Sequence, residues 1–162
     1  MRYFVLDKIT EYTPEKGAKG LKCITLTDPV MHDHFPGLPI LPGALILEGV
    51  AQLAGWLLES VFNQKNKDNI RRALFVQADK VKFYATSEPG DVLEYEVEIK
   101  QLLEDAGKVT FIAKSKLDGE LKAKGILTFH LAQAVDRKEI TEQRQYLYKI
   151  WTKGLENCPP LI

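Results

Sequence analysis

The chain has 162 residues, 45% of them hydrophobic and 27% charged, and its 22 basic side chains balance 22 acidic ones. This composition is typical of a soluble globular protein of one domain, long enough to bury a core. The lack of net charge argues against binding to nucleic acid or to a membrane surface through bulk electrostatics.

The N-terminal segment does not resemble a signal peptide, because Asp7, Lys8 and Glu11 interrupt the apolar core that such a peptide needs. No apolar run approaches the roughly 18 residues of a membrane span. The two cysteines, Cys23 and Cys158, are too few for a disulfide framework. We therefore expect a cytoplasmic protein.

Two strands are predicted before the first long helix, at residues 3–12 and 21–26, with a turn at residues 14–17 between them. A stretch rich in proline and glycine, HFPGLPILPG, then leads into a helix from about residue 42 to about residue 62. Apolar residues, among them Ile46, Val50 and Leu57, lie on nearly all sides of this helix, so we expect it to be buried in the interior.

The second half of the chain has the two-residue period of half-buried strands. A strand over residues 72–84 changes its apolar phase between Ala78 and Val81, which predicts a bulge. After the turn at Pro89-Gly90, three alternating runs follow at residues 94–100, 109–117 and 121–129. Asp118-Gly119 separates the last two runs and predicts a hairpin with a type I′ turn, so the three runs should form an antiparallel meander.

These elements predict an α+β fold in which one antiparallel β-sheet wraps around one long central helix. A polar helix should span residues 136–153. We expect a single domain over residues 1–162 with a C-terminal extension from about residue 132.

Glu48 is an unusual residue for a buried helix, because an unpaired buried carboxylate costs several kcal/mol or becomes protonated. The residues three and four positions away share its face, and these are Ala44, Leu45, Ala51 and Gln52. Desolvation raises the pKa of a carboxyl group, which suits a general acid near neutral pH.

The turn before the helix offers two further groups. Pro42 suits the first helical turn, and the next residue, Gly43, would present an N–H without an intrahelical partner at the positive end of the helix. Such an N–H can polarise a carbonyl and stabilise enolate charge. His34 lies on the stiff loop upstream, and histidine is the side chain best suited to proton transfer at neutral pH.

Structural interpretations compete with each of these roles. A loop histidine is more often exposed or structural, a helical glutamate is more often paired with arginine, and a glycine is more often needed for packing. The run His32-Asp33-His34 also suggests ligands for a metal ion, but Glu48 is the only further donor nearby in the sequence. The chain has no Gly-x-Ser-x-Gly motif, which argues against a serine hydrolase, and it has no P-loop or Gly-x-Gly-x-x-Gly motif.

The segment resembles the active-site motif of the FabZ-type 3-hydroxyacyl-[acyl-carrier-protein] dehydratases. The matching residues are His34-Phe35-Pro36-Gly37, Pro39, Pro42-Gly43, Glu48 and Ala51-Gln52, with Phe83, Pro89-Gly90-Asp91 and Asp118-Gly119-Glu120 further on. The likeness covers roughly residues 2–131. It implies a hotdog fold and a dimer or trimer of dimers, with each active site at a dimer interface.

The resemblance also implies the roles of the residues. His34 of one subunit would remove a proton from C2 of a 3-hydroxyacyl thioester, and Glu48 of the other would help expel the 3-hydroxyl as water. The Gly43 N–H would hold the thioester carbonyl, Gln52 would orient Glu48, and Phe35 and Pro42 would line the site. The resemblance implies that no metal or organic cofactor is needed. Related dehydratases that also isomerise their product carry an aspartate at the position of Glu48. The glutamate here therefore favours dehydration without isomerisation.

The substrate would be carried by an acyl carrier protein, which is acidic and would bind a basic patch. The candidates are Lys65, Lys67, Arg71, Arg72, Lys80 and Lys82, for which an ordinary solvated face without a partner is the competing interpretation. The N-terminal residues and the segment 132–162 depart from the family pattern. An acyl thioesterase and a non-catalytic subunit that binds acyl thioesters are the alternative functions.

Overall fold

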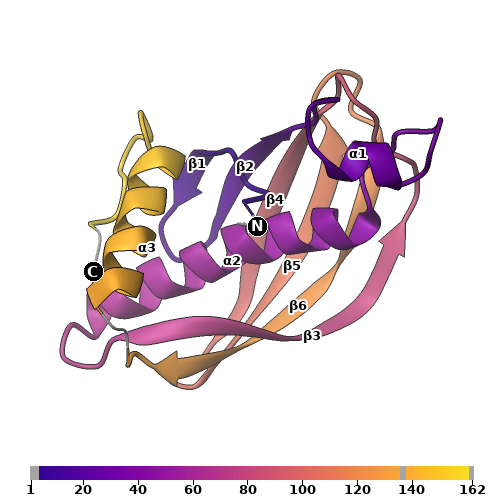
Figure 1. The fold of residues 1–162 in the computed structure, drawn as a ribbon. Helices are drawn as coiled ribbons and strands as arrows, with labels where there is room; N and C mark the ends of the chain where they lie inside the picture. The colour runs from indigo at the N-terminus through magenta and orange to yellow at the C-terminus, as the bar shows by residue number, and fades with distance from the viewer. Residues whose placement is uncertain (1–3, 136–137, 161–162) are drawn as a thin grey trace.

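The computed structural model describes residues 4–135 and 138–160. Within them, the strands are β1 (Lys8–Thr13), β2 (Gly17–Cys23), β3 (Arg71–Phe83), β4 (Val92–Leu102), β5 (Ala106–Ser115) and β6 (Leu121–Gln133). The helices are α1 (Val30–Asp33), α2 (Gly43–Lys65) and α3 (Lys138–Trp151). The strands form one antiparallel sheet in the order β1-β2-β4-β5-β6-β3, which curves around α2, with β3 at one edge (Figure 1).

The core lies between α2 and the concave face of the sheet. Leu53, Leu57 and Leu58 of α2 are fully buried, and Tyr95 and Leu127 meet them from the sheet. The strict alternation of buried and more exposed residues along β5 follows from the two-residue period of a strand with one face on the core. The predicted α+β arrangement of a sheet around one central helix is therefore confirmed.

The meander of β4, β5 and β6 is also confirmed, as is the bulge in β3. The pairing of β3 with β6 shifts between Asp79 and Lys82, and Lys80 within this bulge has a positive φ of 52°. The type I′ turn was wrong. Four residues separate Ser115 from the Glu120 carbonyl that accepts its N–H, and of this loop Gly119 alone has a positive φ.

Several boundaries differ from the predicted ones. Residues 4–7 are not in a strand, β2 begins at Gly17 rather than at residue 21, and α1 was not predicted. Pro42 is the N-cap residue of α2, with a ψ of 134°, so the helix proper begins at Gly43. The polar C-terminal helix is present as α3, and residues 136 and 137 of the predicted range lie outside the described residues.

By length and composition α2 could span a membrane, contrary to the expectation that no segment of the sequence is apolar enough to do so. Its most apolar stretch has a mean hydropathy of 1.4, and 67% of that stretch is buried inside the protein. This burial is what the core helix of a soluble protein shows.

Candidate functional site

His34 is held in a closed loop between α1 and α2. Its backbone N–H donates to the carbonyl of Val30 (3.1 Å), and its carbonyl accepts from the N–H of Ile40 (3.1 Å). The ring nitrogen Nδ1 lies 3.2 Å from the carbonyl oxygen of Ile40. Because a carbonyl only accepts, Nδ1 must carry the proton, and Nε2 of the neutral ring keeps its lone pair. The loop thus fixes the orientation of the ring and leaves Nε2 as the nitrogen that can accept a proton.

Phe35 covers the same ring. The two ring centroids lie 4.4 Å apart and the planes are 24° from parallel, while 55% of Phe35 remains exposed. The backbone groups of Phe35 and Leu38 bond to each other across the turn, where Gly37 has a φ of 78°. The proline- and glycine-rich loop therefore fixes the histidine and presents an aromatic ring to solvent beside it.

Gly43 opens α2 beneath the ring of Phe83. A Cβ on Gly43 would lie 2.8 Å from Cε1 of that ring, so Phe83 occupies the space that a side chain at this position would need. Within the described part of the chain, the Gly43 N–H has no hydrogen-bond acceptor. The free donor at the positive end of the helix was therefore predicted correctly, and the reason for the glycine is the close approach of an aromatic ring.

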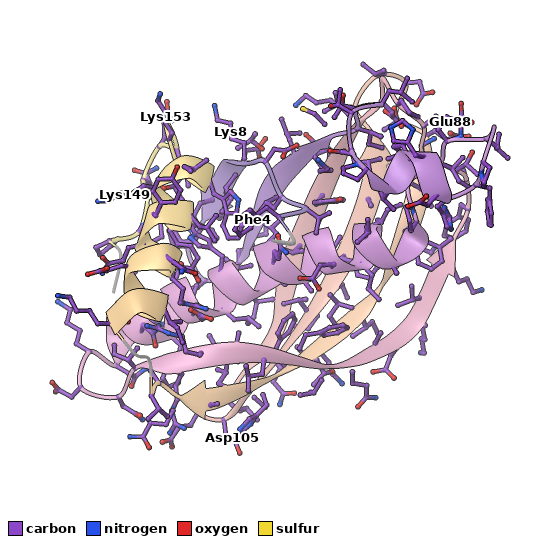
Figure 2. All side chains as sticks on the ribbon, viewed as in Figure 1. Phe4, Lys8, Glu88, Asp105, Lys149 and Lys153 are labelled. Carbon is purple, nitrogen blue, oxygen red and sulfur yellow. The ribbon has the colours of Figure 1, made fainter. Side chains whose placement is uncertain are left out.

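Glu48 and Gln52 lie one turn apart on the same face of α2. Gln52 Nε2 donates to Glu48 Oε1 (2.9 Å), and Gln52 Oε1 accepts from the backbone N–H of Val5 (3.2 Å). The segment before β1 crosses α2 here, and Figure 2 shows Phe4 over the middle of the helix. The amide thereby fixes the carboxylate and leaves Glu48 Oε2 available to another group.

A second carboxylate, which sequence reasoning overlooked, is the buried one. Glu48 is only half-buried, whereas Glu59, three turns further along the same face, is 4% exposed. Glu59 accepts hydrogen bonds from Arg144 and Tyr148 of α3 and pairs with Arg72 of β3 (3.6 Å). The sequence did contain a signal for this cluster. Glu59 is a charged residue in an apolar helix, and Arg144 and Tyr148 lie four residues apart, on one face of the polar helix.

Glu48 lines a groove of about 350 Å³ that runs along α2. The groove passes Gln52 and Gly55 and reaches Leu147 and Trp151 of α3, with β3 and β6 along one side. Its walls are mostly apolar, and Glu48 is at one end while α3 is at the other.

The structure divides the predicted site residues into two groups. His34, Phe35, Pro42 and Gly43 gather at the N-terminal end of α2, and none of them lines the groove that holds Glu48 and Gln52. Within the described residues, no hydrogen bond joins His34 to Glu48. One copy of the chain therefore does not assemble the whole predicted set in one cavity.

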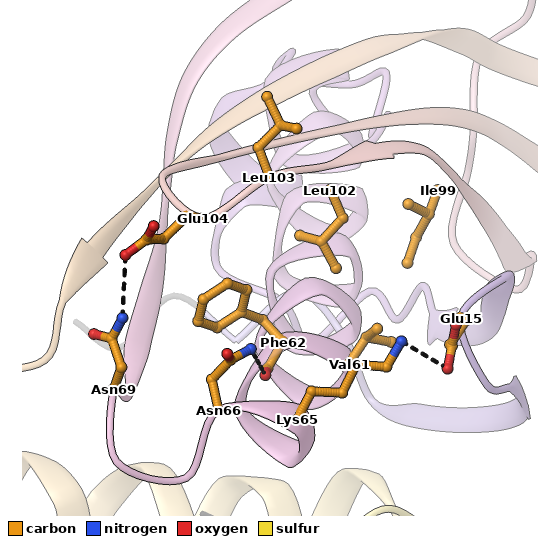
Figure 3. A pocket seen from close by; sticks show the side chains of 10 residues that line it. All are labelled: Glu15, Val61, Phe62, Lys65, Asn66, Asn69, Ile99, Leu102, Leu103 and Glu104. Atoms are coloured by element: carbon orange, nitrogen blue, oxygen red, sulfur yellow. Dashed lines mark hydrogen bonds and ion pairs between the residues drawn. The ribbon is translucent and has the colours of Figure 1, made fainter.

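Another cavity, of about 540 Å³, lies at the C-terminal end of α2 (Figure 3). Its floor is apolar, and its two carboxylates are both engaged: Glu15 pairs with Lys65 (2.8 Å) and Glu104 with Asn69 (3.3 Å). This cavity lacks a histidine and is not the candidate catalytic site. Among residues 4–135 and 138–160, no three His, Cys, Asp or Glu side chains gather as metal ligands.

The predicted basic patch is partly neutralised. Lys65 pairs with Glu15, Arg71 with Glu104 (3.0 Å) and Arg72 with Glu59. Of the exposed cations in the set, Lys65 has this partner, whereas Lys67, Lys80 and Lys82 have no ion pair among the described residues. Lys80 and Lys82 lie on the C-terminal half of β3, which approaches the His34 loop and α1 (Figure 1).

Comparison with known proteins agrees with the motif. The family model of the FabA-like domain matches residues 2–129. The chain is 37% identical over 131 residues to the 3-hydroxyacyl-[acyl-carrier-protein] dehydratase FabZ of Clostridioides difficile, covering 81% of this chain and 88% of the relative. It is 35% identical over 119 residues to the FabZ of Shewanella woodyi, covering 74% of this chain and 76% of the relative.

Solved structures match the fold. The dehydratase heterocomplex ApeI:P of Xenorhabdus doucetiae has a TM-score of 0.64 at 15% identity, covering 88% of this chain and 90% of that one. A hypothetical thioesterase with coenzyme A from Streptococcus pneumoniae has a TM-score of 0.60 at 11% identity, covering 80% and 88%. At these identities the likeness concerns the fold, and the predicted hotdog fold is confirmed.

Proposed function

Because this chain belongs to the FabA-like family, as its motif predicted, we propose that it dehydrates 3-hydroxyacyl thioesters, borne by an acyl carrier protein, to trans-2-enoyl thioesters. The observation that carries the proposal is the family match over residues 2–129, which contain both His34 and Glu48, to relatives named as 3-hydroxyacyl-[acyl-carrier-protein] dehydratases. The reaction belongs to fatty-acid biosynthesis or a related acyl-chain pathway, and we propose that it takes place in the cytoplasm.

In the proposed reaction, the His34 Nε2 lone pair takes a proton from C2 of the substrate, and the electron pair of that bond forms the C2–C3 double bond. The Gly43 N–H donates to the thioester carbonyl and stabilises the charge that develops on its oxygen. Glu48 acts as the general acid and gives a proton to the departing 3-hydroxyl, which leaves as water. The hydrogen bond from Gln52 fixes Glu48 for this transfer, and Phe35 and Pro42 line the entrance.

We further propose that each site is shared between two copies of the chain, His34 coming from one and Glu48 from its partner. The separation of the two groups within one chain supports this arrangement. So does the edge strand β3, where Leu74 and Val76 are 52% and 60% exposed, because an apolar edge strand is a surface for pairing. The assembly would be a homodimer or a trimer of such dimers.

The test is conversion of 3-hydroxybutanoyl thioester to crotonyl thioester by the purified protein, with acyl carrier protein and with coenzyme A as carriers. We expect His34→Ala and Glu48→Gln each to abolish turnover while the oligomer persists in light scattering. Turnover that survives both substitutions would contradict the assignment, and release of free thiol without enoyl product would indicate a thioesterase. Binding without any conversion would indicate a non-catalytic subunit.

Mixing the two inactive variants tests the shared site. A mixed dimer of His34→Ala and Glu48→Gln chains contains one site with both residues intact, so activity should reappear after the subunits exchange. If each chain carried its own complete site, every site in the mixture would lack one residue and no activity would return.

A further inference from the structure

The groove that begins at Glu48 ends against a helix outside the family match. The family model stops at residue 129, whereas α3 begins at Lys138. Figure 1 shows α3 lying across the C-terminal half of α2, and Leu147 and Trp151 of α3 contribute to the groove wall.

The end of the groove is fixed by a cluster of polar groups around the buried carboxylate of Glu59. The Glu59 carboxylate accepts from Arg144, from the Tyr148 hydroxyl (3.2 Å) and from the backbone N–H of Ala73 (2.9 Å), and Arg144 also donates to the Tyr148 hydroxyl (2.8 Å). These bonds hold α3 against α2. An apolar chain could not replace any of them, so it would have to stop before this cluster.

The spacing along α2 gives the groove a length. With a rise of about 1.5 Å per residue, Gly55 lies roughly 10 Å and Glu59 roughly 16 Å beyond Glu48. A hydrocarbon chain extends by roughly 1.3 Å per carbon, given C–C bonds of about 1.5 Å. With C3 of the substrate at Glu48, a 3-hydroxydecanoyl chain would reach Gly55, and a 3-hydroxyhexadecanoyl chain would run into the Glu59 cluster.

We propose that α3 closes the distal end of an acyl-binding groove along α2, so that Leu147 and Trp151 limit the acyl chain to medium length. The inference rests on the proposed dehydratase function and assigns its substrate class. The occupant is the apolar tail of the thioester substrate, since the groove starts at the proposed acid and its walls are mostly apolar.

Two substitutions alter the groove in opposite directions. Gly55 has room for a Cβ, which would meet its nearest atom, Cβ of Ala73, at 3.7 Å, an ordinary contact, and the rest of a longer side chain would enter the groove that Gly55 lines. Gly55→Leu would therefore block the groove midway, while Leu147→Ala would deepen its end. Leu117→Ala, at a site 70% exposed in the hairpin between β5 and β6, is the matched control.

The experiment measures kcat/KM of the full chain for 3-hydroxybutanoyl, 3-hydroxydecanoyl and 3-hydroxyhexadecanoyl thioesters. We expect the wild type to prefer decanoyl to hexadecanoyl. Gly55→Leu should lower the decanoyl-to-butanoyl ratio by about tenfold or more, and Leu147→Ala should raise the hexadecanoyl-to-decanoyl ratio by a similar factor. Leu117→Ala should change neither ratio.

A second readout separates this proposal from the proposed reaction. The two tryptophans of the chain, Trp56 and Trp151, both line the groove, so their fluorescence reports its occupation directly. The two substitutions should change the relative affinities for the decanoyl, butanoyl and hexadecanoyl thioesters by the same factors. These affinities are measured as dissociation constants, even if the protein converts none of the thioesters. Unchanged ratios in both folded variants would overturn the proposal, as would a change of oligomeric state in Gly55→Leu, which would mean that a second copy fills the groove.

Discussion

Glu59 and Arg144 are 85 residues apart in the sequence, and their side chains meet in a hydrogen-bonded ion pair between α2 and α3. The carboxylate is almost fully buried, at 4% exposure, and its second oxygen accepts the N–H of Ala73 at the start of the edge strand β3. One side chain therefore joins the central helix, the edge strand and the C-terminal helix.

Removing this carboxylate should destabilise the protein strongly. Glu59→Ala would leave Arg144 and Arg72 beside a cavity without their shared anion, which for buried pairs costs about 3–5 kcal/mol. Thermal unfolding should show a fall in Tm on the order of 10 °C. The control is Glu142→Ala, which removes an exposed pair with Lys138 (3.9 Å) and should leave Tm nearly unchanged. Equal effects of the two substitutions would contradict the structural role of Glu59.

The same cluster should make stability depend on alkaline pH. Burial of the Tyr148 hydroxyl, aided by the negative charge of Glu59, raises the pKa of Tyr148 above its ordinary value. The folded protein then holds this proton more tightly than the unfolded chain does. The resulting stabilisation is fully present below the ordinary tyrosine pKa of about 10 and is lost as the pH rises above it.

The check compares urea unfolding of the wild type and Tyr148→Phe from about pH 8 to about pH 11. Near pH 8 the variant should be less stable by about 1–2 kcal/mol, since it lacks the hydrogen bond to Glu59. Above about pH 10 the wild type should lose stability faster, so the difference should shrink. A difference that stays constant across this range would show that Tyr148 titrates normally.

Gln52 should act on the reaction by positioning Glu48. Gln52→Leu keeps the size of the side chain but removes both the donor to Glu48 and the acceptor for the Val5 N–H. We expect kcat to fall about tenfold or more with a smaller change in KM, and Gln52→Glu to shift the pH profile by placing a second carboxyl group beside Glu48. An unchanged pH profile in Gln52→Glu would contradict this coupling.

Alanine substitutions at Gly43 and at Gly37 should impair the protein in different ways, the first through activity and the second through stability. Alanine at Gly43 would press on the Phe83 ring (2.8 Å), which is 52% exposed and can move away, so the effect should fall on activity more than on stability. Combining Gly43→Ala with Phe83→Leu should restore part of the lost activity. Alanine at Gly37, whose φ is 78°, touches nothing and should cost about 1 kcal/mol through backbone strain. A Gly43→Ala variant that no Phe83 substitution improves would refute the steric explanation.

The hydroxyl of Tyr95 is buried and has no hydrogen-bond partner among the described residues. Tyr95→Phe should therefore leave the free energy of unfolding unchanged or raise it by up to about 1 kcal/mol, because the unpaired hydroxyl costs free energy on burial. Urea unfolding at neutral pH measures this. A loss of more than about 1 kcal/mol would reveal a bond to this hydroxyl.

The fold followed from local patterns wherever those patterns were periodic. The alternating runs of β4, β5 and β6 and the phase change near Lys80 each reflect which face of one strand meets the core, and this is written in consecutive residues. The type I′ turn was wrong because an Asp-Gly pair does not by itself determine the number of residues in a hairpin loop.

The sequence by itself determined the family, the sheet around a buried helix, and the candidate residues from His34 to Gln52, because these depend on neighbouring residues and fixed spacings. Only the tertiary structure decided that Phe83 covers Gly43, that Glu59 rather than Glu48 is the buried carboxylate, and that α3 ends the groove. These contacts join residues far apart in the chain, and their pairing depends on how the helices and the edge strand pack. No local periodicity encodes that packing.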